Sequence, residues 1–155
     1  PSHLIYMRGA ECEGKKSLDW WRQVGAILVS RDHEVILEAH NQGLPDEYVL
    51  YREGNIRDFI PRGIRPDVSN TIHAEQYLIA DAARKGISTK GTSLYVTHFP
   101  CPVCAKLIAC AGIKACYFSR GSASLEGKKV LEAMGVALFF VPSRNDTMKQ
   151  RKEKM

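Results

Sequence analysis

The chain has 155 residues, of which 45% are hydrophobic and 25% are charged, and its formal net charge is +5. This length fits a single core, so we expect one domain over residues 1–155. No apolar run reaches the roughly 18–20 residues that span a bilayer, and no secretion signal opens the chain. Five cysteines are an odd number, which disfavours a disulfide framework, so we expect a cytoplasmic protein without a membrane partner.

The first elements are predicted to be a helix and a hairpin. Residues 4–12 suit a helix. It would pack three apolar side chains inward, namely Leu4, Ile5 and Ala10. The apolar run 24–29 is typical of a buried strand, and residues 35–39 predict a second strand that pairs with it.

Residues 48–70 are the least regular part of the chain, with two glycines, two prolines and four arginines. We expect an insertion loop, because long loops in compact domains are often functional. The arginines are Arg52, Arg57, Arg62 and Arg65. They suit either a solvated surface or neutralisation of a substrate phosphate. From Thr71 a helix is expected to run to about Lys85, with Gly86 as its C-cap and Leu78, Ile79 and Ala82 facing inward.

Strands and helices then alternate. The predicted strands are 93–97, 115–118 and 136–141, and the predicted helices are 101–111 and 125–134. This order implies parallel strands with right-handed crossovers. The expected fold class is therefore α/β, a three-layer α/β/α domain with a mixed sheet of about five strands. Residues 144–155 form a basic tail, which suits a solvated chain end or weak attraction to nucleic acid.

One histidine and two cysteines form a candidate zinc site. Cys101 and Cys104 are three residues apart, which places both thiols on one face of a helix. Pro102 suits the first turn of that helix, so the thiols lie at its positive end, where thiolate is favoured. With His73 they make three zinc ligands, and a fourth position is left for water, which is typical of a catalytic rather than a structural zinc.

Glu75 is the candidate proton carrier. On a helix His73 and Glu75 point about 200° apart, so both cannot be ligands on one face. They can flank one metal if the N-terminus of their helix points at it. His73-x-Glu75 followed by Pro100-Cys101-x-x-Cys104 matches the signature of zinc nucleobase deaminases, in which this glutamate acts as general acid and base.

The cysteines alone allow other interpretations. A lone Cys-x-x-Cys is often a redox pair or half of a zinc ribbon. A ribbon needs a second pair, which Cys12, Cys110 and Cys116 do not provide, and a redox pair explains neither His73 nor Glu75. We expect Cys110 and Cys116 to be buried as small apolar groups.

Longer stretches resemble the cytidine and deoxycytidylate deaminase family, and its deoxycytidylate branch in particular. They are VGAILV (24–29), HAEQ (73–76), AARKG (82–86), LYVTHFPCPVCAKLI (94–108) and AGIK (111–114). The resemblance covers roughly residues 20–141. It implies a cytidine-deaminase fold, one zinc per chain, a nucleotide substrate and a homo-oligomer.

The resemblance also implies substrate contacts. Asn41 would bind the sugar, and the backbone N–H of Ala74 would bind the pyrimidine carbonyl. Thr97, His98 and Phe99 would line the base pocket. Arg84 matches an arginine linked to phosphate handling in some relatives, and a solvated arginine in the last helical turn is its alternative.

The chain departs from the family pattern at Tyr77, at residues 119–123 and at Gln42, which separates Asn41 from Gly43. The insertion also lacks the cysteines that bind a second zinc in some relatives. Substrate identity and allosteric control are therefore not implied.

The favoured hypothesis is a zinc-dependent hydrolase that deaminates a cytosine nucleotide, with dCMP to dUMP as the expected reaction. A deaminase acting on nucleic acid, either tRNA adenosine or single-stranded DNA cytosine, shares the chemistry, but the chain lacks a basic, aromatic-rich stripe. A zinc-binding module without turnover is the third hypothesis, and Glu75 argues against it.

Overall fold

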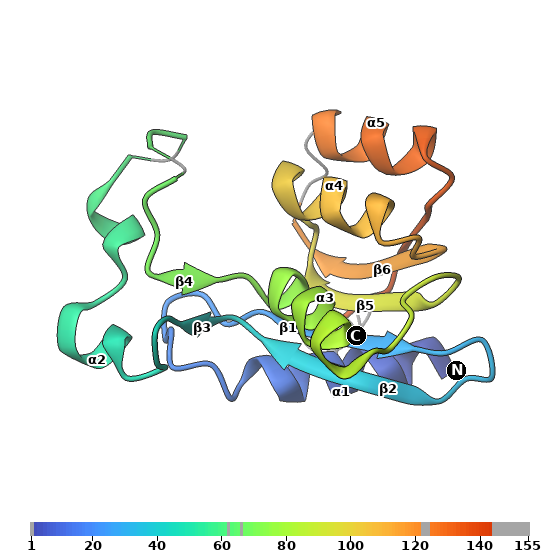
Figure 1. Cartoon of the computed structure of the whole chain (residues 1–155), viewed down its shortest axis with the longest axis horizontal. Helices are drawn as coiled ribbons and strands as arrows, with labels where there is room; N and C mark the ends of the chain where they lie inside the picture. Colours follow the sequence, from blue (N-terminus) through green and yellow to red (C-terminus); the bar gives the residue numbers. More distant parts are fainter. Residues whose placement is uncertain (1, 62, 66, 122–124, 144–155) are drawn as a thin grey trace, which may run out of the picture.

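The computed structural model describes residues 2–61, 63–65, 67–121 and 125–143. Helices and strands alternate from residue 71 onward (Figure 1). In chain order the elements are α1 (Ser2–Gly14), β1 (Gly25–Val29), β2 (Val35–His40), β3 (Gln42–Gly43), α2 (Val49–Glu53), the 3-10 helix η1 (Ile56–Phe59), β4 (Thr71–Ile72), α3 (Ala74–Lys85), β5 (Ser93–His98), α4 (Pro102–Cys110), β6 (Ala115–Arg120), α5 (Leu125–Ala133) and β7 (Ala137–Phe140).

A mixed sheet organises the molecule, with strand order β2-β1-β5-β6-β7. β1 pairs antiparallel with both β2 and β5, whereas β5, β6 and β7 run parallel. Helix α1 packs on one face of the sheet, and α3, α4 and α5 cover the other (Figure 1). The predicted α/β class, hairpin, parallel order and three layers are confirmed.

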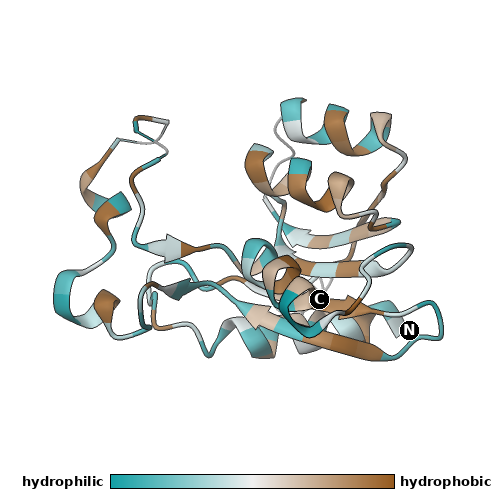
Figure 2. Cartoon of the chain, viewed as in Figure 1, coloured by the Kyte–Doolittle hydropathy of each residue, from teal (hydrophilic) through white to brown (hydrophobic). Residues whose placement is uncertain are grey.

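Burial on both faces explains the apolar run of β1, and brown residues recur along the strands of the sheet in Figure 2. Ala26 and Leu28 belong to the core under α3, α4 and α5, whereas Ile27 and Val29 belong to the core under α1. Side chains alternate between the two faces of a strand, so a strand covered on both sides must be apolar throughout.

The predicted inward face of the first helix is only partly right. Ala10 is buried, but Leu4 and Ile5 are 40% and 65% exposed, and Met7 takes the inward position instead. Met7, Ala10 and Gly14 recur at helical spacing and form the buried face of α1. The predicted Leu4 and Ile5 contacts are therefore wrong.

The predicted start at Thr71 of the helix that carries Glu75 is also wrong. Thr71 and Ile72 form β4 and pair with β3, so α3 begins at Ala74 with His73 as its N-cap. The predicted end is confirmed, because Gly86 caps the helix with a positive φ of 68°, a conformation that glycine adopts without strain. Leu78 and Ala82 are buried as predicted, and Ile79 packs partly buried beside them.

In its described residues, the insertion predicted at 48–70 forms only the short helices α2 and η1, and its α2 end lies away from the main sheet in Figure 1. A hydrogen bond from Asn55 to Asp19 (2.7 Å) ties it to the segment that precedes β1. Among the described residues, no helix is both long and apolar enough to cross a bilayer. The predicted basic tail, 144–155, lies outside the described residues.

Two leucines of α5 provide a matched test of the core. Leu131 is fully buried in the core under α3, α4 and α5, whereas Leu125 is 78% exposed. Leu131→Ala should lower the free energy of unfolding by about 2–5 kcal/mol, because it leaves a cavity. Leu125→Ala should change it by less than about 1 kcal/mol. Equal losses in urea denaturation would contradict this packing of α5.

Candidate metal centre

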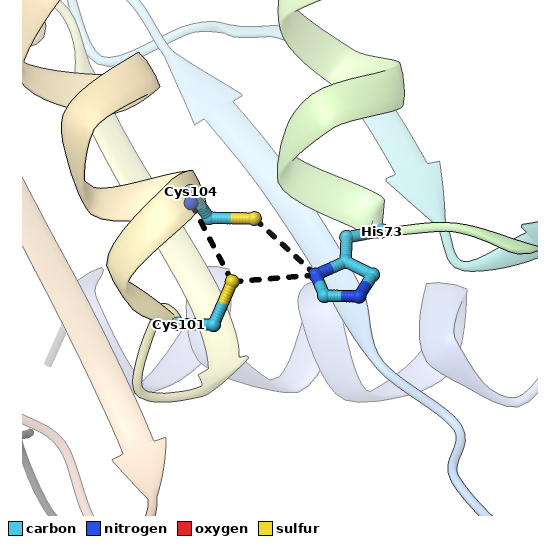
Figure 3. Close-up of side chains that lie close together, drawn as sticks. All are labelled: His73, Cys101 and Cys104. Carbon is cyan, nitrogen blue, oxygen red and sulfur yellow. Dashed lines mark hydrogen bonds between the residues drawn. The ribbon is translucent and has the colours of Figure 1, made fainter. Parts of the chain in front are cut away.

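Three side chains from two separate helix starts meet in one cluster (Figure 3). The Nδ1 atom of His73 lies 3.6 Å from Cys101 Sγ and 3.4 Å from Cys104 Sγ. Among the described residues, this is the one group of three or more potential metal ligands that lie within 4.8 Å of one another. The predicted ligand set is therefore assembled in space.

The spacing of these atoms suits zinc. Tetrahedral zinc with Zn–S near 2.3 Å and Zn–N near 2.0–2.1 Å places sulfur and nitrogen ligands about 3.6 Å apart. The observed separations of 3.6 and 3.4 Å match this value. One imidazole nitrogen and two thiolates are also a donor set that zinc prefers. Cys104 is buried but His73 reaches the surface, so the site is open on one side.

The ligands are held where two helices begin. His73 is the N-cap of α3, and its backbone N–H donates to the Gln76 side chain (3.0 Å). Cys101 is the N-cap of α4, with Pro102 in the first turn, and its sulfur accepts from the Cys104 N–H (3.5 Å). Helix N-termini carry partial positive charge, so they stabilise thiolate and the negative charge of the site.

The two thiols shift each other's pKa in opposite directions. A hydrogen bond from Cys104 lowers the pKa of Cys101 to about 4, while burial opposes this shift. The same pairing, with burial, raises the pKa of Cys104. Because a coordinating thiol loses its proton, both sulfurs would be thiolates around a bound metal.

Glu75 lies beside the ligands and is only 4% exposed. Burial raises the pKa of its carboxyl, while its backbone hydrogen bond and the charges of His73 and Arg22 partly oppose that rise. It also lies within hydrogen-bonding reach of the Cys104 thiol. A buried carboxyl with a raised pKa, next to the potential metal ligands but not one of them, has the properties of a general acid and base.

The residues expected around the base lie at the end of β5, directly before the cysteine motif. Thr97 and Phe99 are buried, and His98 is half-buried. The Thr97 hydroxyl accepts from the Gly25 N–H (3.2 Å) and hydrogen-bonds to His98 Nδ1 (2.9 Å). Ala74, buried in the first turn of α3, lies between His73 and Glu75.

The Asn41 side chain forms hydrogen bonds with the backbone of the segment that enters β1. Its Oδ1 accepts from the Val24 N–H (2.8 Å), and its Nδ2 donates to the Arg22 carbonyl (2.6 Å). The amide thus joins the end of β2 to the segment entering β1. Its expected contact with a sugar stays a prediction.

Arg84 lies in the last turn of α3, roughly 15 Å along the helix from Ala74. Its guanidinium pairs with Asp81, which also pairs with Lys85 (2.7 Å). The structure therefore does not bring Arg84 to the potential metal ligands. Cys116 is buried as predicted, but the prediction for Cys110 is wrong, because Cys110 is exposed on α4.

Two arginines near the site were missed by sequence reasoning. Burial lowers the pKa of His98, and the charges of Arg22 and Arg120 lower it further, so both guanidinium groups lie near this ring. The only sequence signal was their position, since Arg22 precedes the first buried strand and Arg120 ends the strand after the cysteine helix.

The family model for the "cytidine and deoxycytidylate deaminase zinc-binding region" matches residues 2–120. The chain belongs to this zinc-dependent deaminase family. The predicted resemblance and the zinc cofactor are thereby confirmed, and His73, Cys101 and Cys104 form the potential zinc site.

Phage enzymes are among the similar proteins. The chain is 34% identical over 145 residues to deoxycytidylate deaminase of Enterobacteria phage T4, covering 88% of this chain and 72% of the relative. It is also similar to the crystal structure of dCMP deaminase from cyanophage S-TIM5 in apo form (TM-score 0.68, 28% identity, 90% of this chain and 96% of that one). The structure of that enzyme in complex with dCMP and dUMP gives a TM-score of 0.67 at 28% identity, over 88% and 94% of the chains.

Helix α4 supplies a matched pair of cysteines for testing the metal site. Cys104→Ser should reduce bound zinc from one per chain to near zero and lower the thermal unfolding temperature, because metal binding is coupled to folding. Cys110→Ser, on the same helix but exposed, should retain one zinc. Elemental analysis after dialysis would measure both, and full zinc retention by Cys104→Ser would contradict the ligand assignment.

Proposed function

We propose that the protein hydrolyses dCMP to dUMP and ammonia. The observation that carries the proposal is a group of three potential zinc ligands, open on one side, with a buried carboxyl beside it. Relatives named deoxycytidylate deaminase, and a structural neighbour crystallised with dCMP and dUMP, support this substrate.

Glu75 carries the protons in this proposal. Zinc held by His73, Cys101 and Cys104 would supply Lewis acidity that makes a water molecule nucleophilic near neutral pH. The Glu75 carboxylate takes a proton from the attacking water and passes it to the ring nitrogen beside the reacting carbon. It then moves the second proton of that water, from the hydroxyl now on the ring carbon, to the exocyclic amino group, which leaves as ammonia while the carbonyl of dUMP forms. Burial favours this cycle, because it brings the pKa of Glu75 nearer the operating pH.

Other residues would orient the base and sugar. The Ala74 N–H belongs to the first turn of α3, where backbone donors have no partner within the helix, so it can bind the pyrimidine carbonyl. Thr97, His98 and Phe99 would line the base pocket, and Asn41 would contact the sugar while it holds the segment before β1. These roles are proposals.

We also propose that the enzyme acts in the cytoplasm as a homo-oligomer. Exposed Phe139 and Phe140 on β7, the last strand of the sheet, support an oligomer, because exposed apolar patches commonly mark interfaces. The alternatives are not favoured by the comparisons. Similarity to tRNA adenosine deaminases is at 21% identity and concerns the fold alone.

A substrate panel tests the reaction. The zinc-loaded protein should deaminate dCMP with a higher kcat/KM than CMP, deoxycytidine or cytidine, followed as loss of cytosine absorbance. The zinc-free protein should be inactive. Turnover of oligonucleotides but not mononucleotides would favour the nucleic-acid alternative, and zinc binding without turnover of any cytosine compound would reject the proposal.

Replacing Glu75 with glutamine, its neutral analogue, tests the proton carrier. Glu75→Gln should retain one zinc per chain but lower kcat for dCMP by about 10²–10⁴-fold, because general acid–base catalysis contributes that factor. Glu38→Gln, on the exposed face of β2, makes the same change away from the site and should keep normal kcat. Near-normal kcat in zinc-loaded Glu75→Gln would show that another group moves the protons.

A further inference from the structure

A nucleotide substrate brings a phosphate, and the four arginines that the sequence highlighted and the structure describes are already engaged. Arg52 pairs with Asp46 (3.1 Å) and Arg65 with Asp67 (2.9 Å). Arg57 donates to three backbone carbonyls of its own loop. Arg84 pairs with Asp81 at the far end of α3. Arg62 lies outside the described residues. Binding a phosphate with any of the four described arginines would first break an existing ion pair or loop contact.

Arg22 and Arg120 lie at the end of the sheet that carries the metal centre. β5 runs between β1 and β6, and three residues after its end stands Cys101. Arg22 lies just before β1, on one side of β5, and Arg120 ends β6, on the other side. The register pairs Arg120 directly with His98. Ligands of α/β proteins commonly bind at the carboxyl ends of parallel strands, which is where Arg120 and His98 lie.

Backbone hydrogen bonds fix both arginines and leave their side chains exposed. The Arg22 carbonyl accepts from Asn41, and its N–H donates to the buried carboxylate of Asp19 (3.3 Å). The Arg120 carbonyl accepts from the Phe99 N–H (2.8 Å). In the part of the chain that the structure describes, neither guanidinium makes an ion pair, although both act on the His98 ring.

We propose that Arg22 and Arg120 form the subsite that binds the 5′-phosphate of the nucleotide. A phosphate beside His98 would gain two guanidinium partners that no acidic side chain occupies, and arginine can bind phosphate oxygens in a bidentate manner. The subsite would give the enzyme its preference for a nucleotide over a nucleoside. This inference rests on the proposed function, because it assumes a cytosine nucleotide at the zinc site.

The test compares dCMP with deoxycytidine. In the zinc-loaded full chain, R22Q and R120Q should each lower the ratio of kcat/KM for dCMP to that for deoxycytidine by about 10-fold or more, since each removes a charged hydrogen bond to phosphate. R22Q/R120Q should lower the ratio further, and R22K should fall between R22Q and the wild type. R8Q, with the same charge change on the exposed side of α1, should keep the wild-type ratio.

Binding of the product provides a readout without turnover. Calorimetry should show that the wild type binds dUMP more tightly than deoxyuridine, and that R22Q and R120Q lose most of this difference. A loss of folding would instead weaken the binding of dUMP and of deoxyuridine together. The arginines' fixed contacts use backbone atoms, so glutamine should preserve them.

The outcomes separate the two proposals. If the wild type prefers dCMP and both variants keep that preference, the subsite is wrong and the proposed function stands. Equal turnover of dCMP and deoxycytidine by the wild type would also overturn the subsite. If nothing is turned over, the proposed function fails, and the dUMP measurement alone decides the subsite: a preference lost in the variants supports it, and no preference rejects it.

Discussion

The site depends on one packing constraint, which is that two helices must begin at the same point. His73 caps α3 and Cys101 caps α4, although 28 residues of sequence separate them. Both helices pack on the same face of the sheet, so their first turns present one imidazole and two sulfurs to a single metal position. The same arrangement directs two positive helix ends at the centre, which favours thiolate ligands.

The constraint also explains why polar side chains are buried around the site. Asn41, Thr97 and Asp19 are each less than 8% exposed, and each hydrogen-bonds to backbone near the start of β1. The Thr97 bond holds the entry to β1 against the end of β5, where the cysteine motif begins. The Asn41 bonds hold the same segment against the end of β2, and the Asp19 bonds lie within the segment itself. These polar groups support the fold, and the proposed function would give Asn41 and Thr97 a second role in contacting the substrate.

Local patterns allowed the alternating half of the fold and the zinc ligands to be predicted from sequence. Glycines after the helices marked their ends, and the cysteine spacing fixed one helix start. The errors arose where distant contacts decide the outcome. Thr71 pairs with β3 rather than joining α3, and Met7 rather than Leu4 faces the sheet. The positions of Arg22 and Arg120 on either side of His98 follow from the strand order, which no local pattern specifies.

The central claim is that water replaces the cytosine amino group at this zinc site. The most direct measurement is the conversion of dCMP in ¹⁸O-labelled water by the zinc-loaded protein, with mass spectrometry of the product and an assay for ammonia. We expect dUMP carrying one ¹⁸O atom on the pyrimidine ring and an equimolar amount of ammonia, with neither formed by the zinc-free protein. Unlabelled dUMP, or equal turnover without zinc, would contradict it.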